Sequence, residues 1–320
     1  MANEFDLSIV ISSFNRDGKV GETLGALYES DTAGLGRIEL LVIDDGSPKP
    51  VREAIAKAGG PQPPFELRLI EQENSGIGAT RNRGFREAQS DLVLFLDDDI
   101  LVKPSTIKEL LEAHRTHRGG VIFGGYAFKT HESESLRKFA VELYGYDRAS
   151  AEPKFEEVNA ITSGLLLVDK SKLPDRENFY RDDLAIPAAE EHEIIARFHK
   201  LGIPIYNALH ISATHNHHLE LNWLAMQQYK YGLATAEAYA KVPELIEMKR
   251  FADLREKLNF SGPKGLAKRV LASPTGRKTM LRLAQFAETL FPKADNNRLF
   301  GMTASAFFWG GIVEGRKRFL

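Results

Sequence analysis

The first half of the chain alternates short apolar runs with segments whose apolar residues recur at helical spacing. The runs predict buried strands at 7–12, 39–44, 65–70, 92–96 and 121–123. The segments between them predict helices near 20–28, 51–58, 77–88 and 107–114. The second half is less regular, with a strand at 164–168 and helices at 190–201 and 219–240. This pattern is typical of an α/β fold whose mostly parallel sheet carries helices on both faces.

The residues beyond about 240 differ from the rest in charge. Residues 241–320 hold 16 Lys and Arg against 7 Asp and Glu, a net of +9, whereas residues 1–240 have 26 and 37, a net of −11. We therefore expect a catalytic domain at 1–240 and a basic helical region at 241–320. A basic region of this kind either meets an anionic surface or packs as a helical bundle on the acidic domain.

Composition narrows the class of protein. With 43% hydrophobic and 27% charged residues the chain reads as an ordinary globular protein, and we expect no nucleic-acid partner. It has no cysteine, which excludes disulfides and thiolate zinc sites and fits a cytoplasmic location. We expect no signal peptide, because the N-terminus lacks a basic and apolar leader pattern. The uncharged segment Leu299–Val313 is short for a membrane span but suits an interfacial segment or a buried helix.

Polar clusters follow three of the predicted strands. They are Ser12–Arg16, Asp44–Ser47 and Asp97–Asp99. Ligands of open α/β sheets bind at the carboxyl ends of the strands, so these clusters mark a candidate site. Three adjacent carboxylates repel one another unless a cation or a group of donors offsets their charge. They suit a hard divalent cation such as Mg²⁺ or Mn²⁺, although a solvated turn before the next helix explains the same residues.

A glycine-rich segment, Asn74 to Gly84, opens the helix before the fourth strand. Its glycines allow close approach to an anion, and Arg81 or Arg83 adds a positive charge. Taken alone this segment is equally well a turn and an ordinary helix start. Neither the dinucleotide-binding glycine motif nor the phosphate-binding loop of nucleotide hydrolases is present.

Taken in order, these blocks resemble those of a family 2 inverting glycosyltransferase with the GT-A fold. The resemblance continues with Glu190–Glu193 and Arg197, with His215, and with Gln227–Gly232, so it covers about residues 7–235. It implies a Rossmann-like sheet and the metal-dependent transfer of a sugar, with inversion, from a nucleotide-diphosphate donor to an acceptor hydroxyl. The implied enzyme is a hexosyltransferase-type glycosyltransferase of cell-surface polysaccharide or glycolipid synthesis.

The resemblance also implies roles for individual residues. Donor-binding residues are implied at Ser12, Asn15, Asp45, Asn74, Gly78, Arg81, Asp97 and Asp98. Asp99 is implied to hold the Mg²⁺ or Mn²⁺ that bridges the diphosphate, with His215 near that metal. The same implication makes Glu191 the general base, although the family usually has Asp there. Glu190 or Glu193 is the alternative base, and acidic residues in a first helical turn are favourable in any case.

Four histidines, His210, His215, His217 and His218, lie close together in what we expect to be a loop. A zinc site there is the weaker interpretation, because no thiolate accompanies them. A single histidine that meets a metal bound to the diphosphate is the stronger one.

The implied partners are a nucleotide-diphospho-sugar and a glycan or lipid-linked acceptor. The basic C-terminal region would allow peripheral contact with the inner face of the membrane. Three other functions explain parts of the sequence. One is a catalytically inactive nucleotide-sugar or glycan-binding module of the same fold, and another is a scaffold whose basic region does the work. The third, a sugar-phosphate nucleotidyltransferase, needs a glycine-rich basic loop that Ser12–Arg16 does not supply.

Overall fold

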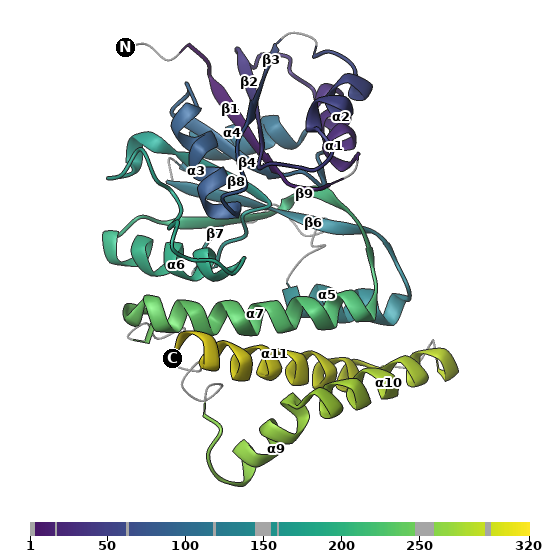
Figure 1. The fold of residues 1–320 in the computed structure, drawn as a ribbon. Coiled ribbons are helices and arrows are strands. Elements are labelled where there is room, and N and C mark those ends of the chain that lie inside the picture. The colour runs from purple at the N-terminus through teal and green to yellow at the C-terminus, as the bar shows by residue number, and fades with distance from the viewer. Residues whose placement is uncertain are drawn as a thin grey trace. The chain divides into compact units, whose positions relative to one another are not determined.

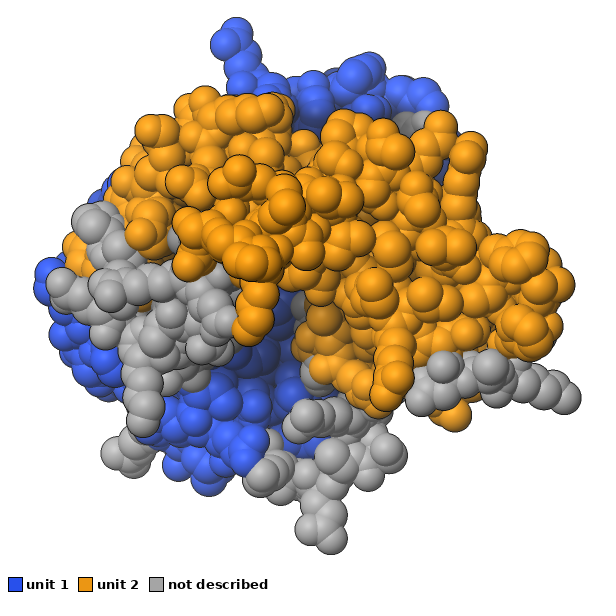
Figure 2. All heavy atoms as spheres, turned by 90° about the horizontal axis from the view of Figure 1, so that it is seen from below, with its two compact units in different colours: residues 1–128, 146–182, 197–217 blue, residues 129–145, 183–196, 218–320 orange. Residues whose placement is uncertain are grey.

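Two compact units make up the chain (Figure 2). The computed structural model describes residues 4–16, 18–61, 64–117, 120–144, 155–158, 160–246, 259–291 and 296–320. Unit 1 comprises residues 1–128, 146–182 and 197–217. Unit 2 comprises residues 129–145, 183–196 and 218–320. The expected boundary between a catalytic domain and a basic region at residue 240 stays a prediction.

Four parallel strands form the first half of the sheet (Figure 1). They are β1 (Leu7–Ser13), β2 (Ile38–Asp44), β3 (Phe65–Glu71) and β4 (Leu92–Asp97), in the order β3-β2-β1-β4. The apolar runs of β1, β2 and β4 are buried on both faces, as expected for parallel strands, whereas the edge strand β3 is mostly half-buried. In this register Ser12 of β1 pairs with Asp97 of β4 on one side and with Ile43 of β2 on the other. The sheet thus brings the polar strand ends to one edge.

Antiparallel strands extend the sheet beyond β4. They are β8 (Leu165–Asp169), β6 (Val121–His131), β9 (Ile205–Leu219) and β5 (Ile100–Leu101), and β7 (Glu156–Glu157) pairs with β9. Among the described residues, these and the parallel strands make one sheet of nine strands. The expected fold class, α/β with helices on both faces, is confirmed. The expected short strand at 121–123 is also confirmed and runs on to His131.

The long strand β9 corrects the sequence prediction that the four histidines lie in a loop. His210, His215, His217 and His218 all belong to β9. The strand has no continuous apolar run. Most of its polar side chains are half-buried, and they alternate irregularly with buried residues. That pattern belongs to an antiparallel strand with one partly exposed face, which apolar periodicity does not detect.

Helices cover both faces of the parallel strands. They are α1 (Lys19–Tyr28), α2 (Val51–Ala58), α3 (Ile77–Glu87) and α4 (Thr106–His117). Ile9 and Ile11 of β1 pack in one core cluster with the buried side chains of α1 and α4. Val10, which points to the opposite face, lies against Gly84 of α3. Because side chains alternate along a strand, α3 and α1 must cover different faces.

Unit 2 is built mainly from helices. They are α5 (Glu134–Tyr144), the start of α6 (Ala189–Leu201), α7 (Leu221–Lys241), α9 (Gly262–Ala272), α10 (Pro274–Leu290) and α11 (Asn297–Phe319). The described residues also include two short 3₁₀ helices, η1 (Lys170–Lys172) in unit 1 and η2 (Pro243–Ile246) in unit 2. In Figure 1, α11 lies between α7 and the pair formed by α9 and α10.

The uncharged segment 299–313 forms most of α11. Phe300 and Ile312 are fully buried, and Phe307 is nearly so. Of the two interpretations from the sequence, the structure shows the buried helix and not an interfacial segment. Within the part of the chain that the structure describes, no helix has the length and apolar character that crossing a bilayer requires.

Glycines allow α7 and α11 to pack with their backbones in contact. A Cβ added at Gly232 of α7 would fall on the carbonyl oxygen of Phe308. A Cβ added at Gly311 of α11 would fall on the carbonyl oxygen of Tyr229. No side chain fits at these two positions unless the helices move apart.

We expect Gly311→Ala to lower the free energy of unfolding by about 1–3 kcal/mol, because the added methyl group overpacks the α7–α11 contact. Gly301→Ala on the same helix is the matched control, since its Cβ would meet only Phe139 Cε2 at 3.8 Å. The control should gain up to about 1 kcal/mol from helix propensity. Urea unfolding of both variants measures the difference, and equal stabilities would contradict this packing.

Candidate active site

The three carboxylates after β4 differ in environment. The Asp97 side chain is 40% exposed, whereas those of Asp98 and Asp99 are nearly buried at 6% and 7%. Each has its own partners, so the repulsion expected from the sequence is relieved in three separate ways.

Asp98 turns back toward β1 and α1. Its Oδ2 accepts a hydrogen bond from Ser13 Oγ at 2.7 Å, and its backbone carbonyl accepts one from Thr23 Oγ1 at 2.9 Å. Arg16 Nε lies 3.7 Å from Oδ1. Burial raises the pKa of Asp98 to about 7, although the Arg16 charge and the Ser13 hydrogen bond oppose the rise. A carboxyl with this pKa carries a proton for much of the time near neutral pH, which reduces the crowding of charge.

Asp99 lies among cationic groups. Its Oδ2 is 3.1 Å from Arg16 Nη1, 3.5 Å from His215 Nε2 and 3.7 Å from Lys19 Nζ. Burial raises the pKa of Asp99, but the hydrogen bond and charge of His215 and the charges of Arg16 and Lys19 outweigh burial and lower it to about 2. Asp99 is therefore ionised at neutral pH.

Asp97 pairs with Arg81 from α3. Arg81 Nη2 lies 2.7 Å from Asp97 Oδ1, and its guanidinium lies 5.2 Å from the centre of the Tyr180 ring. Gly164 leaves room beside this carboxylate, because a Cβ there would lie 3.1 Å from Asp97 Oδ2. The structure therefore brings the predicted site residues Arg81 and Asp97 into direct contact.

Asp45, after β2, anchors the glycine-rich segment. Its Oδ1 accepts a hydrogen bond from the Ser75 backbone N–H at 2.9 Å, and its Oδ2 accepts one from the Gly76 N–H at 3.0 Å. Gln72 Nε2 donates to Oδ1 at 2.8 Å, and Asn74 Nδ2 donates to the Asp45 carbonyl at 3.2 Å. The predicted site residues Asp45 and Asn74 therefore fix the backbone at the start of α3.

Two further predicted residues lie close to the same strand ends. Asn15 has a left-handed backbone (φ 52°), and its N–H donates to Ser47 Oγ at 3.0 Å, which ties the end of β1 to the turn after β2. Ser12 Oγ is buried without a hydrogen-bond partner among the described residues. A buried hydroxyl in that state is costly, so it favours an unseen partner at this edge.

Gly78 and Asn82 hold the segment 179–182 against α3. A Cβ at Gly78 would lie 3.2 Å from the Arg181 carbonyl oxygen, so the glycine makes room for that backbone. The Asn82 side chain accepts from the N–H groups of Phe179 and Tyr180 and donates to the Tyr180 carbonyl. These contacts position Tyr180 beneath Arg81. The predicted role of Gly78 in donor binding stays a prediction.

His215 reaches Asp99 from β9. It pairs with Ile100 of β5, and its ring packs near those of Tyr126, Phe128 and His217 at 5.3–5.6 Å between centroids. Among the described residues, no three His, Asp or Glu side chains are placed to ligate one ion. Asp99 and His215 alone supply one carboxylate and one imidazole. This set fits a divalent cation whose remaining ligands come from substrate phosphate and water.

Glu191 lies in the first turn of α6, which confirms its predicted position at a helix start. Glu190 and Glu193 are buried at 4% and 6%, whereas Glu191 is half-buried. Ala188, just before the helix, has a left-handed backbone (φ 79°), and its carbonyl lies 2.9 Å from His192 Nδ1. The role of Glu191 as a base stays a prediction.

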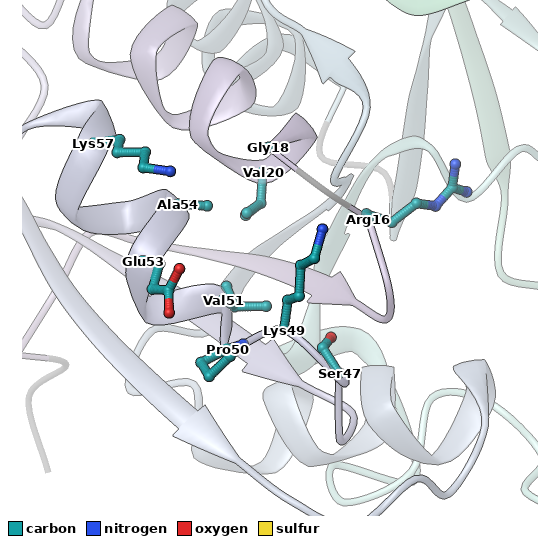
Figure 3. Close-up of a pocket in the computed structure, with 10 residues that line it drawn as sticks. All are labelled: Arg16, Gly18, Val20, Ser47, Lys49, Pro50, Val51, Glu53, Ala54 and Lys57. Carbon is teal, nitrogen blue, oxygen red and sulfur yellow. The ribbon is translucent and has the colours of Figure 1, made fainter.

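A pocket of about 170 Å³ lies beside the carboxylates, between α1 and α2 (Figure 3). It is lined by Arg16, Gly18, Val20, Ser47, Lys49, Pro50, Val51, Glu53, Ala54 and Lys57. It is smaller than the roughly 300–1,000 Å³ of most ligand pockets. Figure 3 shows the Arg16 side chain pointing away from the other lining residues, and its partners are Asp98 and Asp99. Arg16 thus links this pocket to the candidate site.

Sequence reasoning assigned no role to several residues of the site, although Ser13 and Arg16 belong to the cluster Ser12–Arg16 that it marked. Arg16 and Lys19 contact Asp99, Ser13 contacts Asp98, and Gln72 contacts Asp45. Arg16 and Lys19 lie three residues apart just after β1. Two cations so close to a strand end that carries site residues were the signal that could have identified them. No pattern in the sequence pointed to Gln72, which depends on the pairing of β2 with β3.

Comparison with known proteins gives a consistent result. The model of glycosyl transferase family 2 matches residues 8–172. Validoxylamine A glucosyltransferase of Streptomyces hygroscopicus subsp. limoneus is 34% identical over 110 residues, which is 34% of this chain and 23% of that protein. The minor teichoic acid biosynthesis protein GgaB of Bacillus subtilis is 26% identical over 37% of this chain and 13% of its own length. The chain thus spans about a quarter or less of these curated relatives.

Solved structures share the fold across nearly the whole chain. The mannosyltransferase PcManGT from Pyrobaculum calidifontis, in complex with GDP-Man and Mn²⁺, has a TM-score of 0.66 at 15% identity. That match covers 98% of this chain and 88% of the mannosyltransferase chain. S. aureus TarS 1–349 in complex with UDP has a TM-score of 0.51 at 14% identity, with 98% of this chain and 92% of its own covered. At these identities the likeness shows a shared GT-A fold.

We expect Asp98→Asn to become more stable relative to the wild type as the pH rises from about 5 to about 8. The raised pKa means that the folded wild type binds this proton more tightly than the unfolded chain. Its stability therefore falls by up to about 1.4 kcal/mol per pH unit until the pH passes about 7. The variant lacks this loss, so it should gain about 2 kcal/mol relative to the wild type.

Urea unfolding in the presence of a chelator at both pH values tests this expectation. Asp31→Asn is the control, because the lowered pKa of Asp31 keeps that exposed carboxylate ionised over the whole range. Parallel pH curves for the wild type and Asp98→Asn would contradict the raised pKa.

Proposed function

The chain belongs to glycosyl transferase family 2, and we propose that it transfers a sugar, with inversion, from a nucleotide-diphosphate donor to an acceptor hydroxyl. The observation that carries this proposal is the ionised carboxylate of Asp99, held at the end of β4 beside His215, Arg16 and Lys19. A cluster of one carboxylate and several cationic groups suits a substrate whose departing group is a diphosphate bound with a cation.

The proposed donor site lies along the ends of β1, β2 and β4. Ser12, Asn15, Asp45 and Asn74 would bind the nucleoside, and the partnerless Ser12 hydroxyl supports a ligand there. The proposed site also includes Arg81, Gly78, Asp97 and Asp98. The partly exposed Asp97 would lie nearest to the sugar, and the buried Asp98 would contribute through its contacts with Ser13 and Arg16. The GDP-Man, UDP and UDP-GlcNAc held by solved neighbours support a nucleotide-sugar as donor.

We propose that Asp99 and His215 hold Mg²⁺ or Mn²⁺ together with the donor diphosphate. The Mn²⁺ in the mannosyltransferase neighbour supports this assignment. A bound divalent cation would offset the negative charge that develops on the leaving nucleoside diphosphate. Arg16 and Lys19 balance the charge of Asp99 in the structure, and they would bind diphosphate oxygens when a cation takes over the carboxylate.

Glu191 is the proposed general base. It would accept the proton of the acceptor hydroxyl as that oxygen attacks the anomeric carbon from the face opposite the leaving group. A single displacement needs one such carboxylate, and a positioned base contributes about 10²–10⁴-fold to the rate. Glu191 is more accessible than its buried neighbours Glu190 and Glu193, which supports Glu191 over them.

The proposed acceptor is a glycan or lipid-linked sugar of cell-surface polysaccharide or glycolipid synthesis. The similarity to a teichoic acid biosynthesis protein supports this class of acceptor. A lipid-linked acceptor lies at the inner face of the membrane, so we propose peripheral contact there through the basic region 241–320. The region has a net charge of +9, which favours anionic lipid.

We expect Asp99→Asn to lower the rate of sugar transfer by about 10²–10³-fold, because it removes the charge that would hold the cation. The measurement is release of nucleoside diphosphate from a panel of nucleotide-sugars, with Mg²⁺, with Mn²⁺ and with chelator. Asp31→Asn, a change at an exposed carboxylate in the same unit, is the control and should keep full activity. Full activity of Asp99→Asn in chelator would refute the metal-dependent mechanism.

We expect Glu191→Gln to lower transfer by about 10²–10⁴-fold while leaving donor binding unchanged, because only proton removal from the acceptor is lost. Thermal shift with the donor measures binding, and product formation measures transfer. Glu190→Gln and Glu193→Gln are the matched variants on the same helical turn. If one of them carries the loss, that residue is the base. If none does and no donor is turned over, the chain is a binding module.

A further inference from the structure

Large apolar side chains are exposed on two helices of unit 2. Leu266 and Val270 of α9 are 61% and 60% exposed, and Phe286 of α10 is 63% exposed. Leu283, Leu290 and Phe291 are also exposed, at 49%, 52% and 60%. We call these six side chains the α9–α10 face. Leu266 and Val270 lie one turn apart on α9, and Leu283, Phe286 and Leu290 recur at helical spacing on α10, so each helix carries an exposed apolar stripe. Large exposed apolar surface on a folded protein usually marks a binding site.

The orientation of the two helices is the reverse of the usual one. On α10 the buried side chains are Met280 and Ala284, one turn apart, while Phe286 and Leu290 point outward. On α9 the buried positions are Gly265 and Ala272. A Cβ at Gly265 would fall on the backbone of Phe260, so this inner side is tightly packed. These buried positions are few, and most of the large apolar side chains of α9 and α10 remain exposed.

Positive charge surrounds this face. Residues 259–291 contain six Lys and Arg and one acidic residue, Glu288, whose carboxylate accepts a hydrogen bond from Asn296 Nδ2 at 3.1 Å. Two of the six cations have aromatic partners: Arg277 lies over Tyr229, and Lys268 lies over Trp309. The other four are exposed, and the structure shows no ion pair for them with any described residue: Lys264, Arg269, Lys278 and Arg282.

We propose that the α9–α10 face docks on a lipid bilayer that contains anionic lipid. A bilayer surface interacts favourably with both the exposed apolar side chains and the exposed cations. Apolar side chains of an interfacial helix enter the boundary between headgroups and acyl chains, and Lys and Arg beside them are attracted to anionic headgroups. A soluble polyanion would not need six exposed apolar side chains, and an apolar protein partner would not need four exposed cations.

The docking face rests on the proposed function, which includes a lipid-linked acceptor. It places the membrane contact on a narrower segment than the basic region as a whole. In the sequence, the uncharged segment 299–313 was a candidate for the membrane contact. In the structure this segment belongs to α11 and packs against α7. In Figure 1, α9 and α10 form the outer layer of these helices, on the side of α11 that faces away from α7. The contact therefore belongs to 262–291.

Vesicle cosedimentation of the full chain tests the inference. The probes are phosphatidylcholine vesicles and vesicles in which about a third of the lipid is phosphatidylglycerol. The wild type should bind the anionic vesicles and largely remain in the supernatant with neutral ones. Phe286→Ser/Leu290→Ser should lower the partition coefficient by at least about tenfold, since two apolar side chains no longer insert. Lys278→Gln/Arg282→Gln should lower it by roughly 30-fold at low salt.

Leu201→Ser with Lys200→Gln is the matched control, because it removes one exposed apolar and one exposed basic residue from α6 instead. The control should bind as the wild type does. Circular dichroism of each variant establishes that it is folded. Wild-type binding by both α9–α10 variants would overturn the inference. A second outcome would also overturn it. If the wild type forms a dimer in gel filtration, and the α9–α10 variants lose the dimer but keep vesicle binding, the face binds a second copy of the chain.

The readout separates this inference from the proposed function. Vesicle binding needs no turnover, and release of nucleoside diphosphate to a water-soluble acceptor needs no vesicle. If the protein binds anionic vesicles through Phe286 and Leu290 but turns over no donor, the docking face is supported and the proposed activity is refuted. Full turnover without vesicle binding would retain the enzyme and refute the docking face.

Discussion

The candidate site depends on keeping Asp99 ionised inside the edge of the sheet. A carboxylate that is 7% exposed would normally take up a proton, since burial disfavours its charge. Arg16, Lys19 and His215 prevent this, and they come from the turn after β1, from α1 and from β9. Asn216 reinforces the arrangement, because its N–H donates to the Asp99 carbonyl and its own carbonyl accepts from Lys19 Nζ. The charge of one side chain thus ties together three segments far apart in the sequence.

The same constraint explains the behaviour of the neighbouring carboxylates. Asp98 turns toward Ser13, and its burial, with a smaller contribution from the charge of Asp99, raises its pKa to about 7. Asp97 remains near solvent and pairs with Arg81, whose own position depends on Tyr180 and on the hydrogen bonds of Asn82. A motif of three identical residues therefore divides into one ionised group, one group that readily accepts a proton and one partly exposed ion pair.

Unit 2 is held together differently, because glycines allow its two longest helices to approach closely. Gly232 and Gly311 bring the backbones of α7 and α11 together, and Ile312 beside Gly232 is fully buried. Phe300, also fully buried, packs near the Phe139 ring of α5. The helices α9 and α10 attach through Ala272, Met280 and Ala284. Surface packing of this kind leaves the larger apolar side chains of α9 and α10 exposed.

The sequence by itself determined the strand ends and most of the elements. Apolar runs predicted β1, β2, β4 and β8, a segment of mixed apolar and charged residues predicted β3, and helical spacing predicted α1 to α4, because the period of apolar residues is a local property of the chain. Only the tertiary structure decided the rest. The strand β9 has no apolar run to reveal it, and the partners of Asp99 meet because β1, β4 and β9 lie in one sheet. The burial of 299–313 and the exposure of 262–291 also depend on which helix packs on α7, since both segments are apolar and close to basic residues. Contacts between distant segments set charge states and burial, and a linear pattern does not contain them.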